Sequence, residues 1–165
     1  MGFEPVKSVI QADGINDELR HSIWNVLDLH IWTSRGFQQS LPRTGPKIRP
    51  FSQNLWFNYF KKPLDTIPEY SFEIMRTIRA HFYDAPWYKV YDFVEFVVAA
   101  WDDPQLESDL NSVLESELSG FRVIHGVVTP VTDEAEVEAL EKALSPSIFT
   151  GVEIHLKQAL SNLSN

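Results

Sequence analysis

The residues whose types and spacing come closest to a catalytic arrangement are Arg76 and His81, which are separated by four positions in the segment Arg-Thr-Ile-Arg-Ala-His. A histidine can remove or supply a proton in general acid–base catalysis, for instance at a ribose 2′-hydroxyl. An arginine can stabilise the charge that develops on a phosphate during that reaction. The pair therefore predicts one specific chemistry, the cleavage of RNA without a metal ion.

The spacing of this pair resembles the active-site motif of metal-independent ribonucleases that have the higher-eukaryote and prokaryote nucleotide-binding (HEPN) helical fold. Under that interpretation, Arg76 and His81 are catalytic residues of a small ribonuclease that works as a homodimer. The structural interpretation assigns no catalytic residue. Positions five apart do not share a face of a straight helix, so Arg76 would be partly exposed and His81 would lie near a helix end.

Other catalytic and cofactor-binding patterns are missing from the sequence. The seven glycines show no phosphate-binding or dinucleotide-binding pattern, and no serine lies in a Gly-x-Ser-x-Gly turn. There is no cysteine, which excludes disulfides, thiolate metal sites and a cysteine nucleophile. The histidines have no spacing typical of metal ligands, so we expect neither a metal ion nor a cofactor. They are His21, His30, His81, His125 and His155.

Charge is distributed unevenly along the chain, whose formal net charge is −9. Residues 101–145 carry eleven acids and two bases, so the remainder is neutral overall. Within that remainder, residues 35–62 hold six cations and no acid, a combination that could contact the phosphate backbone of a nucleic acid. The alternative is a solvated loop without a ligand. The six candidate binding residues are Arg35, Arg43, Lys47, Arg49, Lys61 and Lys62.

Helical periodicity dominates the rest of the chain. Apolar residues recur at three- and four-residue spacing in several stretches, each of which predicts a helix with one buried face. The segment Arg35–Pro50, rich in glycine and proline, predicts a long loop, and Lys62–Pro68 cannot form a regular helix. The predicted helices span 16–31, 52–60, 68 or 71 to 82, 86 to a break at 102–104, 106–118, 133–144 and 148–163.

A β-hairpin is predicted at residues 121–131. Two short runs of β-branched and aromatic residues flank His125-Gly126, a two-residue turn in which the glycine supplies a positive φ. We therefore expect a mainly α fold with a small antiparallel β-hairpin, an α+β domain built as a helical bundle. The five tryptophans and eleven phenylalanines are expected to pack its core.

Several sequence blocks, taken in their order and spacing, resemble one known family. They are similar to the N-terminal domain of AbiJ-type bacterial abortive-infection proteins, which belong to anti-phage defence. The likeness covers nearly the whole chain. The blocks include Asn16-Asp17-Glu18-Leu19-Arg20 with Ile23-Trp24-Asn25, Trp56-Phe57 with Phe60-Lys61-Lys62-Pro63, Trp87 with Val90-Tyr91-Asp92 and Glu95-Phe96, Gly120-Phe121-Arg122 with Gly126, and His155-Leu156-Lys157.

The resemblance implies a domain at residues 1–145, followed at 146–165 by a linker or the first helix of an effector. In longer members of the family the effector is a helical, ribonuclease-like (HEPN-associated) domain, which we expect to be missing here. The family has no established catalytic set in the N-terminal domain, so its matching residues are expected to be structural. Arg20 is expected to pair with Asp92 or Glu95. The matching residues are Arg20, Trp24, Asn25, Trp87, Tyr91, Asp92, Glu95 and Arg122.

Three functional hypotheses follow. The first is a non-enzymatic sensor or regulatory module of an abortive-infection system, which binds an effector domain, a partner protein or a nucleic acid. In it, the hairpin and the last helix pack on the effector while the basic segment meets a phage cue. The second is the ribonuclease described above. The third is an inhibitor-like module whose acidic face, residues 106–144 with Glu134 and Glu138, covers a basic partner.

The expected location is the cytoplasm. No apolar run approaches the length of a membrane span, and the N-terminus lacks the order of basic and apolar residues that is typical of a signal peptide. We therefore expect no membrane partner.

Overall fold

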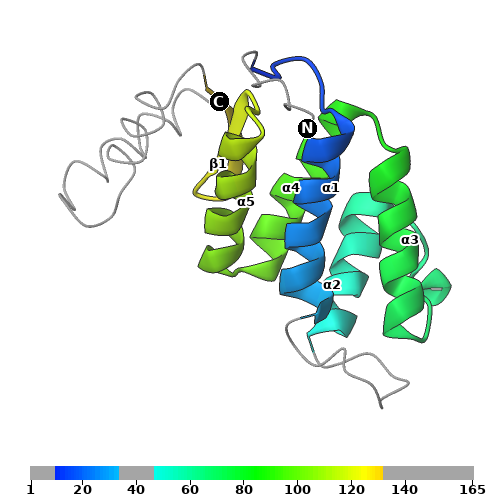
Figure 1. Ribbon diagram of the computed structural model, residues 1–165. Coiled ribbons are helices and arrows are strands. Elements are labelled where there is room, and N and C mark those ends of the chain that lie inside the picture. Colours follow the sequence, from blue (N-terminus) through cyan, green and yellow to red (C-terminus); the bar gives the residue numbers. More distant parts are fainter. Residues whose placement is uncertain (1–9, 34–46, 132–165) are drawn as a thin grey trace, which may run out of the picture.

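The computed structural model describes residues 10–33 and 47–131, which form a bundle of five α-helices with a two-stranded antiparallel sheet on one side (Figure 1). This arrangement confirms the predicted mainly α fold with a small hairpin. The predicted helices at 133–144 and 148–163 lie outside the described residues. The elements are α1 (Asp17–Asp28), η1 (Leu29–Thr33), α2 (Ile48–Asn54), η2 (Leu55–Phe60), η3 (Leu64–Thr66), α3 (Ser71–Asp84), α4 (Trp87–Trp101), α5 (Pro104–Ser116), β1 (Phe121–Ile124) and β2 (Val127–Pro130).

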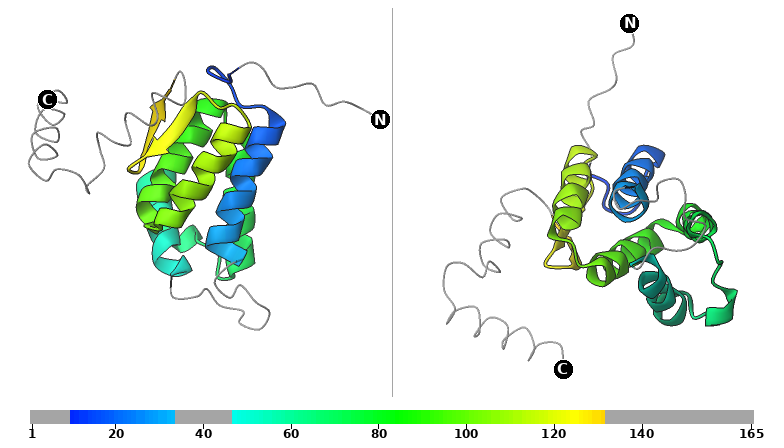
Figure 2. Two further views of the ribbon diagram at one scale, coloured as in Figure 1. Left: turned by 60° about the vertical axis from the view of Figure 1, so that its left-hand side comes forward. Right: turned by 90° about the horizontal axis from the view of Figure 1, so that it is seen from below.

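Helix α4 lies at the centre of the bundle. Seen from below, the other helices surround it, and the hairpin and α3 lie on opposite sides of the molecule (Figure 2). A helix that is apolar around most of its circumference is enclosed by other elements, and α4 has this pattern. Its buried residues are Val90, Tyr91, Phe93, Val94, Val97, Val98 and Trp101.

Aromatic side chains fill much of the core, as the sequence predicts. Trp24, Trp56 and Trp101 are each at most 5 % exposed, and the rings of Phe82 and Phe93 contact each other between α3 and α4 with centroids 6.0 Å apart. Rings of this size bury large apolar areas and stabilise the fold without any ligand.

Helices α1 and α5 begin at residues whose side chains suit a helix start. The Asn16 side chain accepts a hydrogen bond from the Leu19 N–H (2.9 Å), and the Asp103 carboxylate accepts one from the Gln105 N–H (3.0 Å). Both satisfy amide groups that have no partner in the first turn of a helix. Pro104 occupies the first turn of α5, where its missing N–H costs nothing.

Helix α2 begins inside the segment that the sequence predicts as a loop. The expectation was wrong for Ile48, Arg49 and Pro50, which form the first turn of α2. A proline in the first turn removes an amide that has no helical partner, so Pro50 does not prevent the helix. Burial of Ile48 and Phe51 stabilises it. Residues 34–46 of the predicted loop lie outside the described part of the chain.

The hairpin forms with the predicted turn. Ile124 faces Val127 in the register, and His125 and Gly126 between them have φ values of 50° and 79°. Two consecutive positive φ values fit the twist of a two-residue hairpin. Glycine adopts this conformation without strain, whereas a residue with a side chain at position 126 would be strained.

Side chains of α4 and α5 bind the backbone of the hairpin. The Asn111 amide accepts a hydrogen bond from the Val123 N–H (2.8 Å) and donates one to the Val123 carbonyl (2.7 Å). Glu95 accepts from the Val128 N–H (2.7 Å), and Glu107 accepts from the N–H groups of both turn residues. Because these groups lie on the outer edges and at the tip of a two-stranded sheet, the strands themselves cannot satisfy them.

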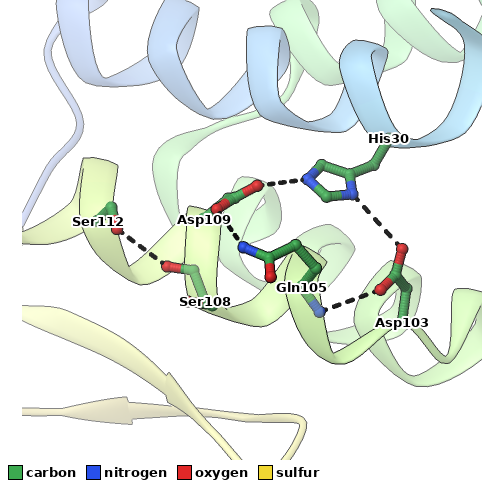
Figure 3. A network of polar contacts seen from close by, with 6 residues as sticks. All are labelled: His30, Asp103, Gln105, Ser108, Asp109 and Ser112. Atoms are coloured by element: carbon green, nitrogen blue, oxygen red, sulfur yellow. Dashed lines mark hydrogen bonds and ion pairs between the residues drawn. The ribbon is translucent and has the colours of Figure 1, made fainter. Parts of the chain in front are cut away.

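A polar network joins η1, which follows α1, to the start of α5 (Figure 3). His30 Nε2 donates to the Asp109 carboxylate (2.7 Å), while His30 Nδ1 lies 3.5 Å from an oxygen of Asp103. The Gln105 side chain also donates to Asp109 (2.8 Å). These two hydrogen bonds lower the pKa of the Asp109 carboxyl, because they stabilise its charged form.

Asn111→Ala is expected to destabilise the domain by about 2 kcal/mol, because it leaves both backbone groups of Val123 without their partner. Urea unfolding followed by circular dichroism measures the change. The matched control is Ser112→Ala on the exposed face of the same helix, where a change within about 0.5 kcal/mol is expected. Equal effects of the two substitutions would contradict the role of Asn111.

Candidate functional site

An open hollow of about 910 Å³ lies between α3 and the segment that leads into this helix from η2. Six of its eight lining residues belong to α3, and the segment contributes the other two. Helix α3, which supplies most of the lining, lies on the side of the bundle away from the hairpin (Figure 1). Its lining residues are Lys62, Pro68, Glu73, Arg76, Thr77, Ala80, His81 and Asp84.

Arg76 and His81 both line this hollow, although positions five apart were not expected to share a helix face. The six lining residues of α3 follow the spacing 73, 76, 77, 80, 81 and 84, which is one continuous stripe of the helix. Arg76 and His81 lie on the two margins of that stripe, and the hollow spans its full width. The buried residues Ile74, Ile78 and Phe82 form the opposite face of α3.

His81 lies half-buried among aromatic rings. Its ring is in edge contact with Phe60 at 4.6 Å between centroids and with Tyr59 at 5.8 Å, and its Nε2 atom is buried without a hydrogen-bond partner in the described structure. Burial lowers the pKa of the His81 imidazole, and the nearby Lys62 charge lowers it further. Both effects favour the neutral form of the ring.

Lys62 reaches the hollow because the chain turns sharply after η2. Lys61 has a left-handed backbone (φ 54°), and the Lys62 N–H closes the turn by donating to the Trp56 carbonyl (2.9 Å). The Lys62 ammonium lies 5.5 Å from the centre of the Phe60 ring. Within the described part of the chain, neither Lys62 nor Arg76 forms an ion pair.

The six predicted binding cations do not form one patch in the part that the structure describes. Arg35 and Arg43 lie outside it. Lys47 and Arg49 flank the start of α2, with the Lys47 ammonium 5.2 Å above the Trp101 ring, whereas Lys61 and Lys62 follow the end of η2. Helices α2 and η2 run consecutively between the two pairs of cations, and a helical segment of that length separates its ends by about 20 Å. Of the four described cations, Lys62 alone lines the hollow.

The predicted pairing of Arg20 with Asp92 or Glu95 was wrong. The Arg20 guanidinium donates to the carbonyls of Phe82, Tyr83 and Ala85 at 2.8–3.3 Å. The last carbonyls of a helix have no partner within it and carry partial negative charge, so they replace a carboxylate as the acceptor. Arg20 thereby joins α1 to the end of α3.

The other family-matching residues have structural positions, except two that are exposed. Trp24 stacks on Trp32, and the half-buried Trp87 packs near Phe121. Asn25 is exposed, and the exposed Asp92 forms an ion pair with Lys89. Glu95 binds the hairpin, as described above.

Tyr91 and Arg122 hold the chain that enters the hairpin. The Tyr91 hydroxyl is 2.6 Å from the Ser119 hydroxyl, and burial raises the pKa of Tyr91 to about 12. The buried Arg122 donates to the carbonyls of Ser119 and Phe121. The two Arg122 bonds satisfy backbone carbonyls at the start of β1.

The acidic face of the third hypothesis is partly used inside the fold. Glu107 binds the hairpin turn, and Asp103 and Asp109 bind His30 and the start of α5. Acids that are engaged in this way are not freely available to a basic partner. Glu134 and Glu138 lie outside the described residues.

No group of three or more His, Asp or Glu residues in the described part of the chain is arranged to hold a metal ion. No helix in residues 10–33 or 47–131 combines the length and apolar character that crossing a bilayer requires.

The comparisons with known proteins identify one family. A family model described as AbiJ N-terminal domain 4 matches residues 1–146. This match confirms the resemblance drawn from the sequence blocks. No curated protein and no solved structure shows significant similarity to the chain.

Lys62→Gln is expected to raise the pKa of His81, because it removes a positive charge that disfavours the imidazolium. A pH titration of the His81 ring resonances by NMR measures its pKa in the wild type and in the variant. The wild-type pKa should lie below the usual value of about 6.5. Because the folded chain holds this proton less tightly than the unfolded chain, the His81 contribution lowers stability as the pH falls below that value.

The matched control is Lys61→Gln, which removes the neighbouring charge outside the hollow and should leave the titration unchanged. A wild-type pKa above 6.5, or equal effects of both substitutions, would contradict the described environment of His81.

Proposed function

This chain belongs to the AbiJ N-terminal domain 4 family, and from that membership we propose that it is a non-enzymatic regulatory module that binds a partner. The family name associates the domain with abortive infection, the bacterial defence against phage. The recognition role, the partner and the site are parts of the proposal. It places the module in the cytoplasm, where an effector would act.

The observation that carries the proposal is the open hollow of α3. Two exposed cations, Lys62 and Arg76, line it without forming an ion pair to any described residue. Glu95, Glu107 and Asp109, by contrast, bind backbone groups or His30. Charged side chains that have no ion pair and line an open hollow are available to bind a ligand. Charged side chains that are hydrogen-bonded within the fold have a structural role instead.

Regulation requires that the ligand bind two states of the module with different affinity, because equal affinity shifts no equilibrium. Helix α4 offers a common element for such a change. Its Phe93 packs near His81 (6.2 Å between centroids) at the hollow side, and its Glu95 binds the hairpin on the other side. In the proposal, occupation of the hollow alters how the hairpin side packs on an effector.

A ribonuclease remains the second candidate, favoured by one observation: Arg76 and His81 line the same hollow. A neutral His81 could accept a proton from a ribose hydroxyl. Its Nε2 atom, however, is buried against aromatic rings, which leaves the other ring nitrogen for that task.

A phage challenge tests the proposed role. In a host that carries the complete defence system, the double variant Lys62→Gln/Arg76→Gln is expected to lose protection, because the partner loses both charged contacts. Plaque counts should rise toward those of a host without the system. Arg79→Gln is the matched control: an exposed arginine of the same helix that lies over the Tyr83 ring, outside the hollow. Full protection by the double variant, with normal protein levels, would refute the assignment.

An RNA cleavage assay separates the two candidates. With a chelator present, the purified chain is expected to leave single-stranded RNA intact, and His81→Ala should make no difference. Gel electrophoresis of the labelled RNA reads out the result. Metal-independent cleavage that disappears in both His81→Ala and Arg76→Gln would favour the ribonuclease instead.

A further inference from the structure

An exposed pair of aromatic rings lies at the start of α3, next in sequence to residues that line the hollow. Tyr70 and Phe72 are 38 % and 46 % exposed, and their rings stack with centroids 6.0 Å apart and planes inclined by 29°. In the chain, both lie between Pro68 and Glu73, which line the hollow. Phe72 and Arg76 are one turn apart on α3 and are therefore neighbours on its surface. Partly exposed aromatic rings next to a cation without an ion pair, Arg76, are suited to a planar, anionic ligand.

The charges of the hollow narrow the choice of ligand. Lys62 and Arg76 can bind phosphate oxygens, for which the arginine fork is suited. Glu73 and Asp84 line the same hollow and would repel a simple polyanion. The exocyclic amino groups of nucleobases, however, donate hydrogen bonds that carboxylates can accept. A mixed set of cations and carboxylates thus fits a nucleotide whose base edge is unpaired.

From these observations we infer that the hollow of α3 binds a single-stranded nucleic acid. Lys62 and Arg76 each bind one phosphate, a base stacks on the Tyr70–Phe72 pair, and Glu73 accepts hydrogen bonds from the base edge. A duplex would hide the base face and edge, so it fits less well. The inference names the ligand class for the recognition role proposed above and rests on that role.

The overall charge of the chain sets the expected strength of binding. A net charge of −9 opposes a polyanion at long range, so affinity depends on the few local contacts. If two phosphates are neutralised, log K should fall with log salt concentration at a slope of about −1.4 for a single strand. This slope is shallow compared with that of proteins that bind through a large basic surface.

Fluorescence anisotropy with a short labelled single-stranded RNA tests the inference on the full chain. Phe72→Ala is expected to weaken binding by roughly 5- to 150-fold, because it removes a stacking platform. Arg76→Gln should reduce the salt slope by about 0.7. Arg79→Gln, the control on the same helix, should change neither quantity. Tyr70→Ala serves as a second stacking variant if circular dichroism shows that Phe72→Ala perturbs the fold.

Single-stranded DNA of the same sequence and the matching duplex complete the experiment. Binding of both single strands in preference to the duplex, or of RNA alone, supports the inference; RNA alone would add a contact to the 2′-hydroxyl. No binding of either strand, tighter binding of the duplex, or equal losses in Arg76→Gln and Arg79→Gln would overturn it. If no nucleic acid binds but the double variant still loses phage protection, the ligand class is wrong and the recognition role stands.

Discussion

Backbone polar groups that their own element cannot satisfy, and the side chains that bind them, determine how this small domain holds together. A two-stranded hairpin is marginally stable in isolation, and its outer edges expose amides and carbonyls. Asn111, Glu95 and Glu107 bind those groups from α5 and α4. Arg20 does the same for the end of α3. Hydrogen bonds from buried or half-buried polar side chains therefore connect elements that otherwise contact one another through apolar groups.

Because some charged side chains bind backbone groups, the charged residues fall into two sets, one structural and one available to a ligand. The acids and arginines that touch backbone groups cannot serve a ligand without weakening the fold. Lys62 and Arg76 have no such duty among the described residues, and they lie where α3 and the segment after η2 leave an open hollow. The scaffold and the candidate recognition surface thus use different residues, although α4 contacts both sides of the molecule.

Local chemistry explains what could be predicted from the sequence. The His125-Gly126 turn and the Asn16 and Asp103 helix starts depend on residues a few positions apart, so their patterns are readable. The start of α2 was missed because a proline in a first turn resembles a loop signal. The acceptor of Arg20 could not be predicted, since the carbonyls at a helix end have no side-chain signature. The meeting of Arg76, His81 and Lys62 depends on how the turn at Lys61 returns the chain to α3. The Arg-Thr-Ile-Arg-Ala-His motif paired Arg76 with His81 in the sequence, but no sequence signal placed Lys62 beside them.

Recognition of a partner by the hollow of α3 is the proposal on which the other functional inferences depend. An amide NMR titration of the full chain with single-stranded RNA tests it most directly, because every residue reports its own environment. The shifted resonances are expected to gather at Lys62, Phe72, Arg76 and Thr77, with the hairpin changing less. Shifts confined to the hairpin turn or spread evenly over the molecule would contradict it.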